Sequence, residues 1–341
     1  MNRPRSLQTV AAAMAAASRV ALMFFLAAAA AADALATCGS SNCFLVTGSK
    51  EGVSPKGAVT LDLSYRYIVQ SRKLDGTSGV GEVLAPRIDF DNEVIEPDHH
   101  REIRTQNTLV ELDVAWGVTD RLTLAADLPL INDRDHEHFD EAGTPAEFFT
   151  KEDGASGFGD ARLGGRYAFL VKSRDLLVGT LAVKLPTGQY KLNDSEGEIN
   201  EPTIQPGSGS YDAIPGVYYA RQIVPSRLEA FGSLSRKINS ANDLDYRFGT
   251  ETLAAAGVQY MAGARVSWSG QVNLRRTGHD LYRDHLVDST GGTLVNLTPG
   301  IRVKSGDSSF YAFLQIPIHQ DVNDAQLAPR TAVLVGVSRR M

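Results

Sequence analysis

The sequence has 341 residues, a formal net charge of −6 and a pI near 5.7, which gives nucleic-acid binding no electrostatic support. Its length allows two globular domains or one large all-β unit. The mean hydropathy of −0.16 does not exclude a membrane barrel, because apolar and polar residues alternate along each barrel strand and cancel in the average.

Residues 1–36 predict a signal peptide that is removed on export. Arg3, Arg5 and Arg19 precede the apolar run 20–32, and Ala34-Leu35-Ala36 supplies a cleavage pattern. The run is too short for a comfortable membrane span. The mature chain is therefore expected to leave the inner membrane.

Residues 37–56 form the predicted N-terminal periplasmic segment, which contains Cys38 and Cys43. In an oxidising periplasm two nearby cysteines favour a local disulfide. A thiolate metal site is a second interpretation. Residues 35–38 also lie close to a lipobox, so lipoprotein processing at Cys38 is a third.

Residues 57–341 predict an all-β fold, an antiparallel transmembrane β-barrel of twelve strands. In the segment 59–67 the odd positions are apolar or aromatic and the even positions are Thr60, Asp62, Ser64 and Arg66. Because a strand sends successive side chains to opposite faces, this segment has one apolar and one polar face. The same alternation predicts further strands near 108–117, 121–130, 159–170, 176–187, 211–222, 227–237, 247–260, 264–275, 293–303, 310–319 and 330–340.

The connections favour a barrel over a soluble periplasmic β-protein. Even-numbered strands end in short turns, such as 118–120 and 224–226. Odd-numbered strands end in longer polar loops, near 71–105, 131–157, 188–210, 238–246, 276–292 and 320–329. Short periplasmic turns and long extracellular loops are typical of the outer membrane, so its lipid is an expected partner.

Aromatic residues and prolines support the same orientation. Six aromatic residues on the apolar face lie beside short turns, where a periplasmic belt is expected: Trp116, Tyr167, Phe169, Tyr219, Tyr260 and Phe310. Pro129, Pro186 and Pro317 stand near the opposite strand ends. Proline lacks an N–H group for the β-ladder, so we expect these residues at a rim or a bulge.

Five segments resemble a family of outer-membrane barrels labelled as the MetA pathway of phenol degradation, or "transporter", family. They are Gly117–Leu124, Gly157–Arg162, Lys184–Gly188, Gln205–Asp212 and Gly291–Gly300, and the resemblance runs from about residue 55 to the C-terminus. It implies a barrel related to channels for hydrophobic compounds and supplies no catalytic residues. Such barrels usually end in an aromatic residue that the barrel-assembly machinery recognises, and this machinery is another expected partner. Here the chain has Arg339 and a final Met341 instead, which puts recognition by the usual route in question.

The polar face predicts a charged lumen. Its candidate residues are Asp62, Arg66, Glu111, Asp113, Asp127, Asp160, Arg162, Arg166, Lys184, Glu229, Arg265, Arg275 and Arg302. Charges of both signs fit either a hydrated pore or a lumen closed by paired charges, and the sequence leaves both interpretations open. The function expected from the barrel is passage of small solutes, and the family resemblance implies that these include hydrophobic or aromatic ones.

All seven histidines lie in or beside the predicted long loops. The candidate metal ligands are His99, His100, His136, His138, His279 and His285, with His319 close to the last loop. Imidazole binds zinc and copper well, so a Zn²⁺ or Cu²⁺ site at the extracellular mouth is one hypothesis, and ordinary loop solvation is the other. The alternative function is a closed barrel whose histidine-rich and acidic loops bind a metal or a partner. No catalytic motif is present, and no enzyme activity is expected.

Overall fold

The computed structural model describes residues 52–341. The predicted signal peptide, the Cys38–Cys43 disulfide and the lipoprotein site lie outside the described residues. No helix within residues 52–341 is both long enough and apolar enough to cross a membrane.

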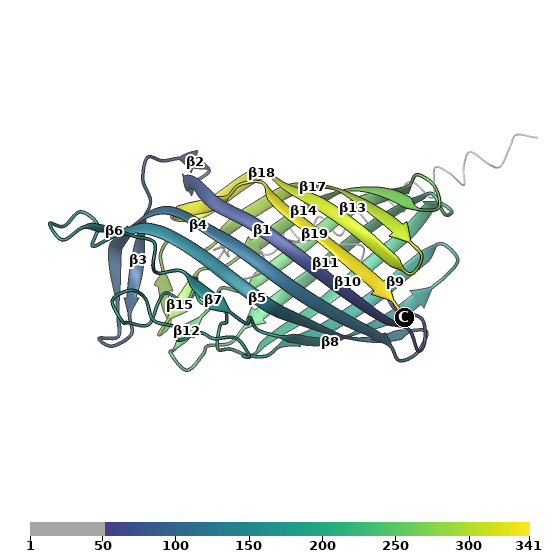
Figure 1. Ribbon diagram of the computed structural model, residues 1–341, viewed down its shortest axis with the longest axis horizontal. Coiled ribbons are helices and arrows are strands. Elements are labelled where there is room, and N and C mark those ends of the chain that lie inside the picture. Colours follow the sequence, from purple (N-terminus) through teal and green to yellow (C-terminus); the bar gives the residue numbers. More distant parts are fainter. Residues whose placement is uncertain (1–51) are drawn as a thin grey trace, which may run out of the picture. The chain divides into compact units, whose positions relative to one another are not determined.

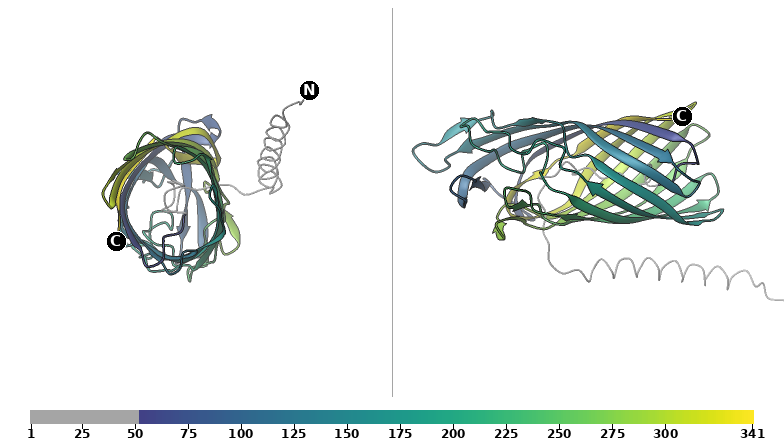
Figure 2. Two further views of the ribbon diagram at one scale, coloured as in Figure 1. Left: turned by 90° about the vertical axis from the view of Figure 1, so that its right-hand side faces the viewer. Right: turned by 90° about the horizontal axis from the view of Figure 1, so that it is seen from below.

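Twelve long strands of the described chain form a closed antiparallel barrel, which confirms the predicted fold class and strand number (Figure 1). The barrel strands are β1 (Val59–Gly76), β4 (Val94–Gly117), β5 (Leu122–Asp140), β8 (Arg162–Val171), β9 (Asp175–Lys184), β10 (Asp212–Val224), β11 (Leu228–Asn239), β13 (Glu251–Met261), β14 (Val266–Thr277), β17 (Gly292–Ser305), β18 (Ser308–Pro329) and β19 (Ala332–Arg340). Each pairs with its chain neighbour, and pairing of β1 with both β4 and β19 closes the ring seen end-on in Figure 2.

The remaining strands are short and belong to the connections. They are β2 (Ser78–Gly79), β3 (Leu84–Asp89), β6 (Phe148–Thr150), β7 (Ala155–Gly157), β12 (Tyr246–Arg247), β15 (Asp280–Tyr282) and β16 (His285–Val287). The last three form a separate small sheet. Its Tyr246, Tyr282 and Val287 pack with Phe248 and with Ile88 of β3, so three long connections share one apolar cluster.

The alternation of side chains along each strand produces the two faces of the wall. On β1, Leu63 and Tyr65 are more than two-fifths exposed, whereas the alternate residues Ser64 and Arg66 are buried. The predicted belt aromatics follow the outward positions, since Trp116, Tyr167, Phe169, Tyr260 and Phe310 are exposed. The outward face is therefore apolar, as lipid contact requires, and the polar side chains point inward.

The apolar outer surface ends partway along β4 and β5. Val110 lies opposite Ile131, and the next outward pair is Thr108 and Asp133, after which the outward residues of both strands are mostly polar. The two strands continue well beyond this level, to Val94 and Asp140. They extend past the lipid-facing band, and their outer parts project on the side of the long connections (Figure 1).

Several segments that the sequence predicted as loops therefore form β-strands in the structure. The ranges 71–105 and 131–157 contain the outer parts of β1, β4 and β5, and the range 320–329 pairs with β1. Both faces of these extensions carry polar residues, so the alternation that marked the other strands is lost. Pro129 and Pro317 adjoin register shifts in the β4–β5 and β17–β18 pairs, as expected for proline in a ladder.

The described part of the segment 37–56 lies against the inside of the wall. The backbone N–H of Ser54 donates to Thr123 Oγ1 at 2.7 Å, and Val53 packs on an inward apolar cluster that includes Tyr218 and Phe231. Residues 52–54 therefore enter the lumen at the short-turn end of the barrel.

Candidate functional site

The inward charges of the lumen are joined in pairs. Glu111 of β4 is almost completely buried, and its two carboxylate oxygens lie 2.5 Å from Arg66 Nη2 and 2.8 Å from Arg162 Nη2. Arg162 Nε lies 3.2 Å from Asp127 Oδ2. Four of the predicted lumen residues thus form one connected network across β1, β4, β5 and β8.

A second network lies on the following strands. Lys184 Nζ is 2.8 Å from Asp160 Oδ2 and 3.0 Å from Asp212 Oδ2, and Lys237 Nζ is 3.7 Å from the same Asp212 oxygen. Arg275 Nε lies 2.6 Å from Glu251 Oε2. Opposite charges are matched at contact distance, so the lining does not present a strong field of one sign.

The other predicted lumen residues lie outside these two charge networks. Asp62 Oδ1 accepts a hydrogen bond of 2.6 Å from Tyr311, and the Arg302 guanidinium lies 4.7 Å from the centre of the same ring. Asp113, Arg166 and Glu229 occupy inward positions of β4, β8 and β11. Arg265 departs from the prediction: it lies exposed in the turn between β13 and β14, because β14 begins one residue later.

The lumen also has apolar inner surface, which the sequence did not reveal. One inward cluster contains Ala168, Val178, Tyr218, Ala220 and Phe231, and another contains Ile68, Tyr311, Phe313, Ala332 and Leu334. These residues occupy the inward positions that polar residues fill elsewhere. Three of the inward aromatic rings lie directly opposite a glycine on the neighbouring strand. These glycines were the one feature of the sequence that could have indicated the apolar inner surface.

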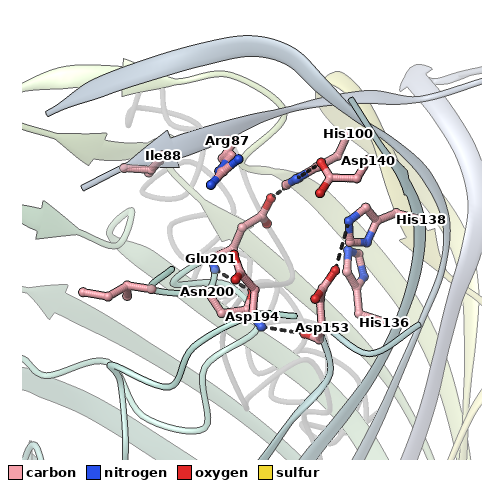
Figure 3. A pocket seen from close by; sticks show the side chains of 11 residues that line it. Arg87, Ile88, His100, His136, His138, Asp140, Asp153, Asp194, Asn200 and Glu201 are labelled. Atoms are coloured by element: carbon pink, nitrogen blue, oxygen red, sulfur yellow. Dashed lines mark hydrogen bonds and ion pairs between the residues drawn. The ribbon is translucent and has the colours of Figure 1, made fainter. Parts of the chain in front are cut away.

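Four of the seven histidines gather at the outer end of β4 and β5. The ring centres of His99 and His100 are 4.8 Å apart, those of His100 and His138 are 4.5 Å apart, and those of His138 and His136 are 4.6 Å apart. His100, His136 and His138 line a cavity of about 20 Å³ together with Asp140, Asp153 and Glu201 (Figure 3). We name these four imidazoles and three carboxylates the histidine–acid cluster.

Strand pairing produces this arrangement. His136, His138 and Asp140 are spaced two residues apart on β5, so their side chains share the inner face. Glu102 of β4 is the register partner of His138, which brings His100 beside Asp140. The predicted H-x-H motif thus has both imidazoles on one side, although it lies on a strand extension rather than in a loop.

Asp140 and Glu201 hold the first two histidines. Asp140 Oδ1 lies 3.0 Å from His99 Nδ1 and 3.2 Å from His100 Nε2. Glu201, from the connection between β9 and β10, lies 2.7 Å from His100 Nδ1. Figure 3 shows Glu201 reaching His100 from the side opposite the strands. This carboxylate was not a sequence candidate, because it is 101 residues away in the chain.

His136 and His138 are buried with little hydrogen bonding. His136 Nδ1 is 3.0 Å from Thr105 Oγ1, while its Nε2 has no hydrogen-bond partner in the described chain. Neither nitrogen of His138 has one, although Nε2 lies 3.4 Å from Asp153 Oδ2. The two side chains are only 4% and 2% exposed, and both line the small cavity of the cluster.

Protonation is unevenly distributed in the cluster, which lies beyond the apolar outer band. Burial opposes protonation of His100, but Asp140 and Glu201 outweigh it and raise the pKa of His100 to about 10. Burial lowers the pKa of His136 to about 3 and lowers the pKa of His138, for which the His100 charge is a second cause. At neutral pH the latter two imidazoles are uncharged, with lone pairs free to bind a cation.

The other histidines lie elsewhere. His279 precedes β15 and its ring approaches the carbonyl of Val287 at 3.3 Å, and His285 is exposed on β16. His319 is exposed on β18. The predicted set of six metal-ligand candidates is therefore divided, since the structure brings His99, His100, His136 and His138 together without His279 and His285.

Residues 98–325 match a protein family described as "Putative MetA-pathway of phenol degradation". The chain belongs to this family. The membership confirms the resemblance noted in the sequence, and the match includes most of the barrel and the whole histidine–acid cluster.

The chain is similar to solved outer-membrane proteins, and the first of them shares its fold. The COG4313 outer membrane channel from Pseudomonas putida F1 is 13% identical, with a TM-score of 0.61 over 87% of this chain and 100% of that one. The Pseudomonas putida toluene transporter TodX is 9% identical, with a TM-score of 0.40 over 84% of this chain and 90% of that one. No curated protein matches the sequence.

Proposed function

We propose that the protein is an outer-membrane channel that passes small hydrophobic solutes, including monoaromatic ones. The observation that carries the proposal is the apolar inner surface of a closed barrel, where Tyr218, Phe231, Tyr311 and Phe313 point inward. Supporting it are the family description, which refers to phenol degradation, and the fold shared with an outer membrane channel.

The two kinds of lining have complementary roles in this proposal. Aromatic and aliphatic side chains offer an apolar solute a surface on which it leaves water, at roughly 25 cal/mol for each Å² removed. Charge pairs such as Glu111 with Arg66 and Arg162 keep the rest of the lumen hydrated without a dominant sign. Such a lining selects by polarity and size rather than by charge.

The orientation follows from the connections. The short turns face the periplasm and the long connections, with the extended β4–β5 pair, face the exterior. The proposed route therefore begins at the outer mouth, beside the histidine–acid cluster, and ends at the short turns, where Val53 meets the inner apolar cluster. Nothing in the proposal requires catalysis, so the protein acts as a transporter and not as an enzyme.

The test is uptake by liposomes that contain the folded full-length protein. Phenol or toluene should enter faster than through empty liposomes, and a sugar of similar size should gain less. Replacing Tyr218 and Phe231 with serine should reduce the aromatic flux more than the sugar flux. A correctly folded barrel that passes neither solute and carries no current in a planar bilayer would contradict the proposal.

A further inference from the structure

The channel proposal gives no role to the imidazoles at the outer end of β4 and β5. We propose that His99, His100, His138 and Asp140 bind one divalent transition-metal ion of the Zn²⁺ class. We call these four residues the His₃Asp site. The inference concerns metal binding itself and does not depend on whether the barrel conducts solutes.

Three of the ligands already converge. Single ligand atoms of His99, His100 and Asp140 all lie within 4.8 Å of one another. Asp140 Oδ1 is 3.0 Å and 3.2 Å from the two imidazole nitrogens. In a tetrahedral site with bonds of about 2.0–2.1 Å, neighbouring ligand atoms are separated by about 3.3 Å. The two separations between Asp140 and the imidazole nitrogens are within a few tenths of an ångström of this value.

In this proposal the His138 ring turns toward the other three residues and supplies the fourth ligand. Its ring centre is 4.5 Å from that of His100, and it follows the same inner face of β5 as Asp140. The side chain is 2% exposed, and neither ring nitrogen has a hydrogen-bond partner within residues 52–341. Burying a polar group without a partner is unfavourable, and a metal bond would satisfy this one.

The outer contacts of the three imidazoles follow the pattern seen around metal-bound histidines. A metal-bound imidazole typically donates its second N–H to a carboxylate, which fixes the tautomer. Here His100 Nδ1 lies 2.7 Å from Glu201, which leaves Nε2 toward Asp140. His138 Nε2 lies 3.4 Å from Asp153, which leaves Nδ1 for the ion.

His99 repeats this arrangement. Its Nε2 is 3.5 Å from Glu141 and 3.6 Å from Glu96, whereas Nδ1 faces Asp140 and is without a hydrogen-bond partner in the described chain. His99 and His100 therefore each present one nitrogen to Asp140 and the other to a second carboxylate, while His138 has Nε2 toward Asp153.

The local charge favours a cation at this centre. Asp140, Asp153 and Glu201 are all largely buried in the cluster. The nearby Arg87 is engaged by Glu196 and Glu198. Buried carboxylates are costly unless a positive charge accompanies them. Protonated His100 provides part of that charge, and a divalent ion would displace its proton and supply the charge at short range.

The ligand types select the ion. Three imidazoles and one carboxylate in a four-coordinate arrangement suit Zn²⁺, whereas Mg²⁺ and Ca²⁺ prefer six or more oxygen ligands. A bound ion would also restrain the mouth of the barrel. Through His100 and His138 it would fix Glu201, in the β9–β10 connection, and Asp153, which follows β6, to the wall formed by β4 and β5.

Calorimetric titration of the folded full-length protein with Zn²⁺ tests the proposal. We expect one ion per chain for the wild type and at least a 100-fold loss of affinity in the His100→Ala/His138→Ala double variant. The matched control is His279→Ala/His285→Ala, which removes two histidines outside the site and should bind as the wild type does. Glu201→Gln should weaken binding by about 10–100-fold, because it removes a carboxylate that orients His100.

Absence of binding to the wild type would overturn the proposal, as would equal affinity in the His100→Ala/His138→Ala variant or equal loss in the control. Heat-modifiable gel mobility reports whether each variant is folded. If the double variant does not fold, His138→Asn alone should still lower the affinity, and unchanged affinity would refute the site. X-ray absorption of the zinc-loaded wild type should show three imidazole ligands and one carboxylate, and a shell of oxygens alone would contradict the ligand set.

Discussion

Phe313 of β18 lies directly opposite Gly300 of β17 on the inner face of the barrel, with its ring over the glycine. The same relationship joins Phe231 to Gly257 and Tyr311 to Gly336. A missing side chain on one strand gives the aromatic ring of the next strand room to lie along the wall. Large aromatic side chains can thus pack flat against the inner face of the wall.

A side chain at position 300 should disturb this packing. In Gly300→Ala the new Cβ would lie 2.1 Å from Phe313 Cδ1, so the ring must turn away from the wall and into the lumen. We expect a loss of about 1–3 kcal/mol in the free energy of unfolding, measured by denaturant titration in detergent, together with a smaller single-channel conductance.

Gly270→Ala is the matched control, since a Cβ at that position on β14 meets nothing within 4 Å. It should change neither stability nor conductance. Adding Phe313→Leu to Gly300→Ala should recover much of the loss, because a smaller flexible side chain can move aside. If Gly300→Ala is as stable and conductive as Gly270→Ala, the aromatic–glycine packing has no energetic importance.

The sequence predicted the wall of this barrel well, for a physical reason. Lipid on one side and a hydrated lumen on the other impose strict alternation, as between Leu63 and Ser64, and this alternation can be read without a structure. The strand extensions were missed because no lipid contacts them. Beyond Val110 and Ile131 both faces meet water or protein, so polar residues such as Asp133 appear on the outer face too.

The alternation of side chains along the strands predicted the histidine–acid cluster only in part. Strand periodicity put His136 and His138 on one face, but the proximity of His100 depends on the register between Glu102 and His138. Glu201 comes from a different connection altogether. Register and loop placement result from packing among segments far apart in the chain, which a single sequence does not specify.

The carboxylate of Glu111 should contribute strongly to the stability of the lumen. Glu111→Gln would leave Arg66 and Arg162 facing one another, with Asp127 as the remaining partner of Arg162. Removing one member of a buried ion pair typically costs about 2–5 kcal/mol. We expect a loss in this range in denaturant unfolding and a reversal potential shifted toward anions in a salt gradient.

Glu229→Gln provides the comparison for Glu111→Gln, since Glu229 also points inward but has no ion pair with another described residue. It should alter stability by less than about 0.5 kcal/mol. Equal effects from the two substitutions would indicate that the Arg66–Glu111–Arg162 contacts add nothing beyond the presence of a lumen charge.

The β9–β10 connection should be held to the wall by Asn132. The buried side chain of Asn132 donates through Nδ2 to the carbonyl of Pro206 at 2.6 Å, which ties this connection to the inner face of β5. Asn132→Ala should cost about 1–3 kcal/mol by leaving that carbonyl without its partner. Planar-bilayer recordings should then show larger or more variable conductance, and recordings identical to those of the wild type would show that the connection does not limit the passage.

The outward surface of β14 distinguishes a membrane barrel from a water-soluble one. Val272 is 44% exposed and has the outward residues Ala256 and Leu297 as its strand neighbours. In water Val272→Arg would be almost neutral, whereas in lipid an arginine near the midplane costs about 2–4 kcal/mol. We expect this loss for the protein unfolded from lipid vesicles. Asp135→Arg, an exposed outward position of β5 beyond Ile131, should have little effect, and equal stability of the two variants would argue against a lipid-facing β14.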